Sequence, residues 1–239
     1  MGAKSPKPSS RNRNRDAPVS SAPNRDLEDE VADDGSPVAV FAALPDRGIA
    51  AMLHSQMLDG DSVLELGCGA GRVANRLFDL GHPVCAVDSS PAMLAYVTSH
   101  AERVEADLFA LDLRRRFGAV VAGSYLVNQW PPLLLAACAR HVERDGAVFV
   151  QRYSPTWARA AEVGEAQSGP VLIRFDPMSC DGDRLVATVT YSLGDRSWQQ
   201  SLDAHVLDDA TLARHARYAG LKFDGIIDEF GEWARLVIG

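Results

Sequence analysis

Three glycines stand at alternate positions in the stretch VLELGCGAGRV, at Gly67, Gly69 and Gly71. Glycine adopts left-handed backbone conformations without strain and lets another group approach the main chain closely. The stretch begins as an apolar run, as expected where a strand leads into a helix at the ligand-binding edge of an α/β sheet. We therefore expect this turn to lie against a bound ligand.

Two carboxylates accompany the glycine turn. Glu65 stands two residues before the first glycine, and Asp88 closes the next apolar run, 21 positions after Gly67. An acid at the end of a second strand can accept both ribose hydroxyls of a nucleoside. The carboxylate of Glu65 would repel a pyrophosphate, whereas it would attract an ammonium or a sulfonium. Together the two acids predict a nucleoside ligand that carries a positive charge.

Other nucleotide sites fit the glycine spacing less well. A dinucleotide fingerprint reads G-x-G-x-x-G, but Arg72 occupies the position of its last glycine. The chain also lacks the Gly-Lys-Ser/Thr sequence of a triphosphate loop. A nicotinamide-dependent oxidoreductase is therefore the less favoured alternative.

At this point the chain resembles a known family. Residues 65–71 (ELGCGAG) match the first motif, E/D-x-G-x-G-x-G, of the class I S-adenosylmethionine-dependent methyltransferases. Three later stretches are similar to further parts of that family: Asp88-Ser-Ser-Pro-Ala-Met-Leu94, Ala106-Asp-Leu108 and residues 117–124. The resemblance covers roughly residues 40–239, and it departs from the family at Gly118, where many relatives have Asp.

The resemblance implies S-adenosylmethionine as cofactor. Asp88 would accept hydrogen bonds from the ribose hydroxyls, and Asp107 would accept one from the adenine amino group. The glycine turn would lie under the methionine part. The residues that the resemblance places around the cofactor are Glu65, Gly67, Cys68, Gly69, Gly71, Asp88, Ser89, Met93, Asp107, Leu108 and Ser124. The implied activity is transfer of a methyl group to an O or N atom of a small molecule by in-line displacement. A non-catalytic relative that binds the cofactor or a partner stays open, because methyl transfer requires no diagnostic catalytic residue.

The methyl acceptor should lie where the fourth and fifth strands end, beneath an insertion. Ligand pockets have aromatic walls and a few polar anchors, and the candidates of this kind are Tyr125, Asn128, Trp130, Arg152, Trp157 and Trp198. His205 and Tyr153 are the candidates for a proton-accepting group. The N-P-P-Y motif of enzymes that methylate nucleobase or glutamine amino groups is absent, because two residues separate Asn128 from Pro131.

The composition of the chain limits the kinds of partner and the cellular compartment that we expect. The formal net charge of −8 argues against a nucleic-acid partner. Four cysteines without metal-ligand spacing predict free thiols in a reducing compartment and no metal site. No apolar run is long enough to span a membrane and no secretory segment is evident. We expect a cytoplasmic bacterial enzyme, either a monomer or a homodimer, that acts on a small molecule.

The elements that must position these residues alternate between strands and helices. Residues 1–36 are polar and predict a disordered tail, and residues 37–239 predict a single methyltransferase domain. Strands are expected at 62–66, 82–87, 104–106, 119–122, 147–151, 221–228 and 233–238. Helices are expected within 37–57 and at 72–80, 91–100, 133–142 and 208–218. Alternating strands at 171–175, 184–192 and 197–205 predict a small antiparallel insertion over the active site, at about 165–206. The fold class is α/β: a Rossmann-like, doubly wound, mostly parallel seven-stranded sheet with an antiparallel C-terminal edge.

Overall fold

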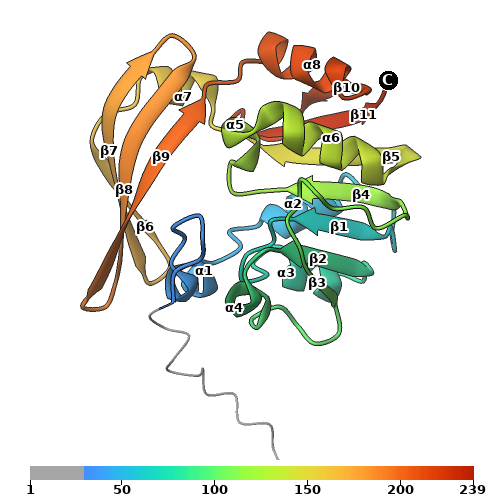
Figure 1. Ribbon diagram of the computed structural model, residues 1–239, viewed down its shortest axis with the longest axis horizontal. Coiled ribbons are helices and arrows are strands. Elements are labelled where there is room, and N and C mark those ends of the chain that lie inside the picture. Colours follow the sequence, from blue (N-terminus) through green and yellow to red (C-terminus); the bar gives the residue numbers. More distant parts are fainter. Residues whose placement is uncertain (1–29) are drawn as a thin grey trace, which may run out of the picture.

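The computed structural model describes residues 30–239 and contains a central seven-stranded sheet (Figure 1). Its strands are β1 Val63–Leu66, β2 Val84–Asp88, β3 Glu102–Glu105, β4 Phe117–Ala122, β5 Val142–Gln151, β10 Leu221–Ile226 and β11 Trp233–Ile238. They pair in the order β10-β11-β5-β4-β1-β2-β3. Strand β11 runs antiparallel to its two neighbours, β5 and β10, and the other pairs of the sheet are parallel. The predicted Rossmann-like sheet with an antiparallel C-terminal edge is thereby confirmed.

Helices cover both faces of this sheet, because its central strands are apolar on both sides. Leu64 and Leu66 of β1 belong to one buried cluster, which includes Leu134 of α6. Val63 belongs to a second cluster on the opposite face, which includes Leu77 of α3. The helices are α1 Val38–Ala43, α2 Ile49–His54, α3 Ala74–Asp79, α4 Pro91–Leu94, α5 Leu126–Gln129, α6 Pro131–His141, α7 Pro155–Arg159 and α8 Asp209–Tyr218. These layers fix the carboxyl ends of β1, β2 and β4 at one edge of the domain.

A separate antiparallel sheet, here called the second sheet, follows α7. Its strands are β6 Gly164–Ser168, β7 Val171–Asp181, β8 Arg184–Leu193 and β9 Arg196–His205, paired in chain order. Figure 1 shows this sheet standing beside the carboxyl ends of the central strands. Its buried face includes Leu185 of β8 and Leu202 of β9, and Tyr153 packs against it. The antiparallel insertion expected from alternating residues is thus present, with a fourth strand, β6, that the sequence does not predict.

Some predicted elements differ in length. The helix expected at 91–100 ends at Leu94. The Asn75 side chain accepts a hydrogen bond from Thr98 N at 2.7 Å and donates one to Tyr96 O at 3.2 Å, so it takes up backbone groups that a longer helix would pair. The short helices α5 and α7 are not evident in the sequence, because four or five residues are too few to show a helical period.

The boundary of the predicted tail also differs. Residues 1–29 lie outside the described residues, but 30–36 form a turn in which Val31 makes a β-bridge to Pro37. Gln200 of β9 donates from Nε2 to Asp34 O and to Ser36 Oγ, both at 3.2 Å. Backbone and side-chain hydrogen bonds therefore order this polar segment without an apolar core of its own.

The structure also bears on the expectations about membrane spans, cysteines and metal sites. No helix within residues 30–239 is long and apolar enough to cross a membrane. All four cysteines are free thiols; Cys180 is exposed and the other three are buried. In the same part of the chain, no group of three or more His, Cys, Asp or Glu side chains is arranged to hold a metal ion.

Candidate functional site

The glycine turn after β1 requires glycine at the backbone level. Gly67, Gly69 and Gly71 have φ values of +67°, +53° and +77°, a region that L-residues with a side chain enter at a cost. A Cβ atom on Gly67 would lie 2.4 Å from Leu126 Cδ1. The turn therefore packs against the first residue of α5, so the ends of β1 and β4 meet here.

Asp88 closes β2 beside this turn. Its carboxylate accepts hydrogen bonds from Gly69 N at 2.8 Å and from Ser90 N at 2.9 Å, one on each oxygen. Burial raises the pKa of Asp88, and these two N–H groups oppose that rise. Each carboxylate oxygen has a second acceptor position, so the group can hold the turn and still accept hydrogen bonds from a ligand.

Glu65 is the least satisfied polar group of the site. It is only 4% exposed, and its Oε2 atom has no hydrogen-bond partner among the described residues. Burial raises the pKa of Glu65 to about 8, while the charge of Arg72 and a hydrogen bond from Ala74 N–H act in the opposite direction. A buried carboxylate oxygen without a partner costs free energy. Such an oxygen beside a glycine turn fits a ligand that brings a positively charged donor.

Other residues predicted to contact the cofactor lie close to the turn in different environments. Cys68 is buried, and burial raises the pKa of its thiol. Met93 is 2% exposed and packs in a cluster with Val38 and Ala70. Ser89 is exposed at the start of the loop after β2.

The loop after β3 carries the two remaining residues of that set. Asp107 is exposed, and its Oδ1 accepts a hydrogen bond from Phe109 N at 2.9 Å. The Leu108 side chain lies 3.8 Å from the position that a Cβ on Gly67 would take. The loop thus lies against the glycine turn, with the Asp107 side chain at the surface.

The end of β4 has a strained backbone. Ser124 and Tyr125 have φ values of 53° and 59°, both in the left-handed region, and such strain in residues other than glycine is concentrated at functional sites. Ser124 N donates to Gln151 Oε1 at 3.0 Å, which ties this turn to the end of β5. The two turns, one after β1 and one after β4, therefore border the same region.

Four aromatic rings form a continuous column from β4 to the second sheet. Tyr125 stacks on Tyr153 with ring centroids 4.1 Å apart and planes 6° from parallel. Tyr153 stacks on Trp157 at 5.5 Å, and Trp157 contacts Phe175 of β7 at 5.0 Å. Burial raises the pKa of both phenols, which keeps them neutral. The first three rings are candidates from the sequence, whereas Phe175 is not.

A carboxylate that the sequence does not single out lies at the start of this column. Glu232 Oε2 accepts hydrogen bonds from Tyr125 OH and from Gln151 Nε2, both at 3.2 Å. Glu232 directly precedes β11, and Gln151 pairs with Trp233 across β5 and β11. The one feature of the sequence that points to Glu232 is that it is an acidic residue directly before the last predicted strand. This feature places Glu232 beside the end of β5 only when the order of the strands in the sheet is known.

Two residues predicted to line the acceptor pocket are structural instead. Asn128 is fully buried; its amide donates to His205 O at 2.7 Å and accepts from Tyr153 N at 3.0 Å. The Arg152 guanidinium is also buried and donates to Leu207 O at 2.8 Å. Both side chains are occupied by hydrogen bonds within the protein, so we correct the assignment of Asn128 and Arg152 to the pocket.

His205 is separated from Tyr153. Successive side chains of a strand point to opposite faces, and Ala204 lies in the buried cluster that Tyr153 contacts. His205 therefore points to the other face of β9, where it lines a cavity of about 500 Å³ with Trp130. The structure therefore does not bring the two candidates His205 and Tyr153 together at one site.

The other two tryptophans predicted to line the pocket do not join the aromatic column. Trp130 is 40% exposed and contacts Phe109 edge-on, with ring centroids 5.4 Å apart. Trp198 lies near the tip of the second sheet, where the Arg196 guanidinium sits 5.1 Å from its ring centroid. Of the aromatic pocket candidates, the structure brings together only Tyr125, Tyr153 and Trp157.

Comparison with known proteins identifies the family. A model of the methyltransferase domain family matches residues 63–146, which include the glycine turn, Asp88 and Ser124. The chain is also 30% identical over 194 residues to the cypemycin N-terminal methyltransferase of Streptomyces sp, a match that covers 77% of this chain and 75% of that relative. The chain belongs to the S-adenosylmethionine-dependent methyltransferases. S-adenosylmethionine is accordingly the cofactor of this methyltransferase.

Solved structures share the fold of this methyltransferase. The CcbJ methyltransferase from Streptomyces caelestis superposes with a TM-score of 0.64 at 22% identity, over 90% of this chain and 95% of that one. The sugar N-methyltransferase KedS8 from Streptoalloteichus sp ATCC 53650 superposes with a TM-score of 0.60 at 19% identity, over 85% of this chain and 89% of that one. At these identities the likeness establishes the architecture alone.

Proposed function

We propose that this methyltransferase transfers a methyl group to an amine nitrogen of a small molecule or short peptide. The observation that carries this proposal is the column of Tyr125, Tyr153 and Trp157, which begins beside the Glu232 carboxylate. Aromatic faces and carboxylates both favour a positively charged group. An acceptor nitrogen becomes positively charged as it takes up a methyl group, so this environment suits it.

Residues around the glycine turn would hold the cofactor. We assign Glu65 to the ammonium of its methionine part, because Oε2 is buried without a partner among the described residues. Asp88 would accept from the ribose hydroxyls while it keeps its bonds to Gly69 and Ser90. Asp107, in the loop after β3, would accept a hydrogen bond from the adenine amino group. When bound, S-adenosylmethionine supplies a methyl group on a sulfonium sulfur; the chain's own residues orient the acceptor and exclude water.

A hydroxyl acceptor fits the site less well. A phenol or alcohol must lose its proton to a nearby base. Burial holds the pKa of Tyr153 above its usual range, and His205 points away from the aromatic column. An ammonium group loses its proton far more readily than an alcohol does, so water or a weak base such as a carboxylate is enough to expose the nitrogen lone pair. The nearby carboxylate would also disfavour a phenolate, which carries the same charge.

The names of similar proteins agree with an amine acceptor. The relative from Streptomyces sp is an N-terminal methyltransferase, and KedS8 is a sugar N-methyltransferase. The name of KedS8 specifies methylation at nitrogen, and the name of the relative from Streptomyces sp specifies the N-terminus, where a peptide carries an amine. The amine is therefore the shared chemistry on which we base the proposal, and the rest of the acceptor is left to experiment.

Turnover with matched acceptors tests this proposal. Each pair contains an amine and its blocked or hydroxyl counterpart: a tripeptide and its N-acetyl form, an amino sugar and the parent sugar, and benzylamine and benzyl alcohol. Formation of S-adenosylhomocysteine is followed by mass spectrometry. We expect turnover of amine members only. Methylation of the hydroxyl members alone would refute the proposal, and cofactor binding without any turnover would favour a non-catalytic relative.

A further inference from the structure

The Glu232 carboxylate has neutral hydrogen-bond partners. Tyr125 OH and Gln151 Nε2 both donate to its Oε2 atom at 3.2 Å. Within residues 30–239, no Lys, Arg or His side chain forms an ion pair with Glu232. A half-buried carboxylate that keeps an unused oxygen beside stacked rings has the chemistry of an ammonium site. The charge of Glu232 also contributes to the raised pKa of Tyr125, so this carboxylate acts electrostatically on the first ring of the aromatic column.

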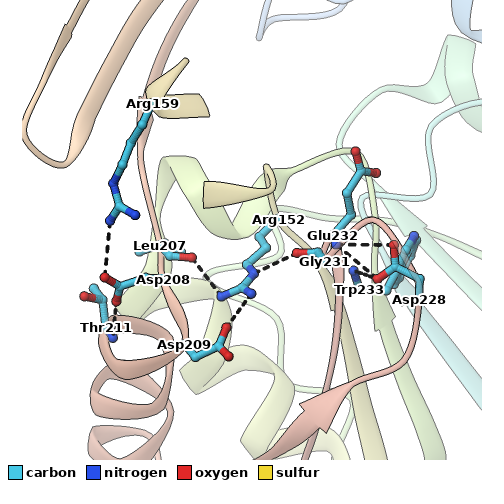
Figure 2. Close-up of polar contacts among 10 residues, drawn as sticks. All are labelled: Arg152, Arg159, Leu207, Asp208, Asp209, Thr211, Asp228, Gly231, Glu232 and Trp233. Carbon is cyan, nitrogen blue, oxygen red and sulfur yellow. Dashed lines mark hydrogen bonds and ion pairs between the residues drawn. The ribbon is translucent and has the colours of Figure 1, made fainter. Parts of the chain in front are cut away.

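The loop that carries Glu232 is held rigidly from both sides. The Asp228 carboxylate accepts hydrogen bonds from Glu232 N at 3.0 Å and from Trp233 N at 2.7 Å. Arg152 N donates to Glu232 O at 2.7 Å, and the Arg152 side chain donates to Gly231 O at 3.2 Å. Figure 2 shows the contacts of Asp228 and of the Arg152 side chain, and the Glu232 side chain pointing away from them. These bonds fix the backbone of Glu232, and the bonds from Tyr125 OH and Gln151 Nε2 hold its carboxylate.

The buried Arg152 is central to this arrangement. Besides the Gly231 carbonyl, its guanidinium binds Leu207 O at 2.8 Å and the Asp209 carboxylate at 2.5 Å. It thereby joins the loop before β11 to the start of α8 (Figure 2). Arg152 and Asp228 are consequently positioning residues, and Glu232 is the side chain that they position.

We infer that Glu232 binds the ammonium group of the methyl acceptor and so determines that amines are selected over hydroxyl compounds. The bound ammonium must release one proton, to the Glu232 carboxylate or to water, before its nitrogen takes the methyl group. This inference rests on the proposed function and adds the residue that would discriminate amines from hydroxyl compounds. The ring of Tyr125 provides the adjoining surface, and the Gln151 amide donates to the same carboxylate oxygen as the Tyr125 hydroxyl. The ligand is recognised by its charge, so any small primary or secondary amine that reaches the site should show the preference.

The test compares binding of benzylamine and benzyl alcohol to the protein saturated with S-adenosylhomocysteine, followed by tyrosine and tryptophan fluorescence. Glu232→Gln keeps the shape and removes the charge. Glu229→Gln removes a charge from an exposed residue of the same loop and serves as the matched control. The wild type and the control should prefer the amine, and E232Q should lose about tenfold or more of that preference with unchanged affinity for benzyl alcohol.

Three results would overturn the inference: no amine preference in the wild type, a preserved preference in E232Q, or an equal loss in E229Q. Thermal unfolding of each variant checks that the fold is retained, and Glu232→Asp, which keeps the charge, should retain part of the preference. The turnover experiment separates the role of Glu232 from the choice of acceptor. If amines are methylated equally well by E232Q, the role of Glu232 fails and the proposed function stands, whereas methylation of hydroxyl compounds alone refutes both.

Discussion

Replacing Glu65 with Gln should abolish most of the pH dependence of cofactor binding. Burial raises the pKa of Glu65 from its ordinary value of 4.5 to about 8, and its Oε2 atom has no partner among the described residues. The protein without cofactor therefore carries a proton on Glu65 at neutral pH. A ligand ammonium beside the carboxylate favours the ionised form, so binding should release that proton.

The magnitude follows from the pKa. With a pKa of about 8, roughly nine-tenths of Glu65 is protonated at pH 7, and ionising it costs about 1.4 kcal/mol. Binding should thus be about tenfold weaker at pH 7, and about a hundredfold weaker at pH 6, than in the fully ionised state. The affinity should rise with pH and level off above about pH 8.

Calorimetric titration with S-adenosylhomocysteine measures both quantities. Titrations between about pH 6 and pH 9, in buffers of different ionisation enthalpy, give the number of protons released. The wild type should release close to one proton at pH 7, and E65Q should release about one fewer. Ionisation of the ligand itself is common to both proteins and cancels in the difference.

Equal proton release by the wild type and E65Q would refute the reasoning, because Glu65 would then not respond to the ligand. Stability gives an independent check. The pKa of Glu65 is raised in the folded protein, so its contribution to stability is fully present below pH 4.5 and is lost as the pH rises through about 8. The loss amounts to at most about 5 kcal/mol and should be absent in E65Q, as measured by urea unfolding at several pH values.

Three further substitutions test the site and its supports. Gly67→Ala places a Cβ 2.4 Å from Leu126 Cδ1 at a φ of +67°, so the free energy of unfolding should fall by about 2–4 kcal/mol; an unchanged melting temperature would contradict the close packing. Asp88→Asn should weaken S-adenosylhomocysteine binding by about 3 kcal/mol, or roughly 150-fold, and near-normal calorimetric affinity would remove the ribose assignment. Asn128→Leu leaves His205 O and Tyr153 N without their partner and should cost about 2–5 kcal/mol in urea unfolding; the His205→Ala control should change stability little.

The central sheet could be predicted because its signals are local. The glycine turn, Asp88 at the end of β2 and the alternation of strands with helices all lie within short stretches of sequence, and together they define the fold and the cofactor end of the site. The short elements α5 and β6 escaped prediction because their form depends on neighbours, such as the packing of Leu126 against the turn at Gly67.

The acceptor end was harder to predict because its contacts join distant segments. Glu232 meets Tyr125 across more than a hundred residues, and Arg152 bonds to carbonyls from two other loops. The residue types of Asn128 and Arg152 suit a pocket, but burial turned both into supports for the backbone. The separation of His205 from Tyr153 could not be predicted, because the face on which His205 lies depends on the register of β9. The sequence indicates the residue types and their approximate positions in the fold, whereas the direction in which each side chain points depends on the folded structure.

The central claim is that the methyl group goes to nitrogen. The most direct measurement gives the enzyme acceptors that contain both an amine and a hydroxyl group, namely an amino sugar and a peptide that begins with serine. With S-adenosylmethionine labelled with ¹³C in its methyl group, the carbon spectrum of the product distinguishes N-methyl from O-methyl. The account predicts an N-methyl signal that disappears when the amine is acetylated. An O-methyl signal from the same acceptors would contradict it.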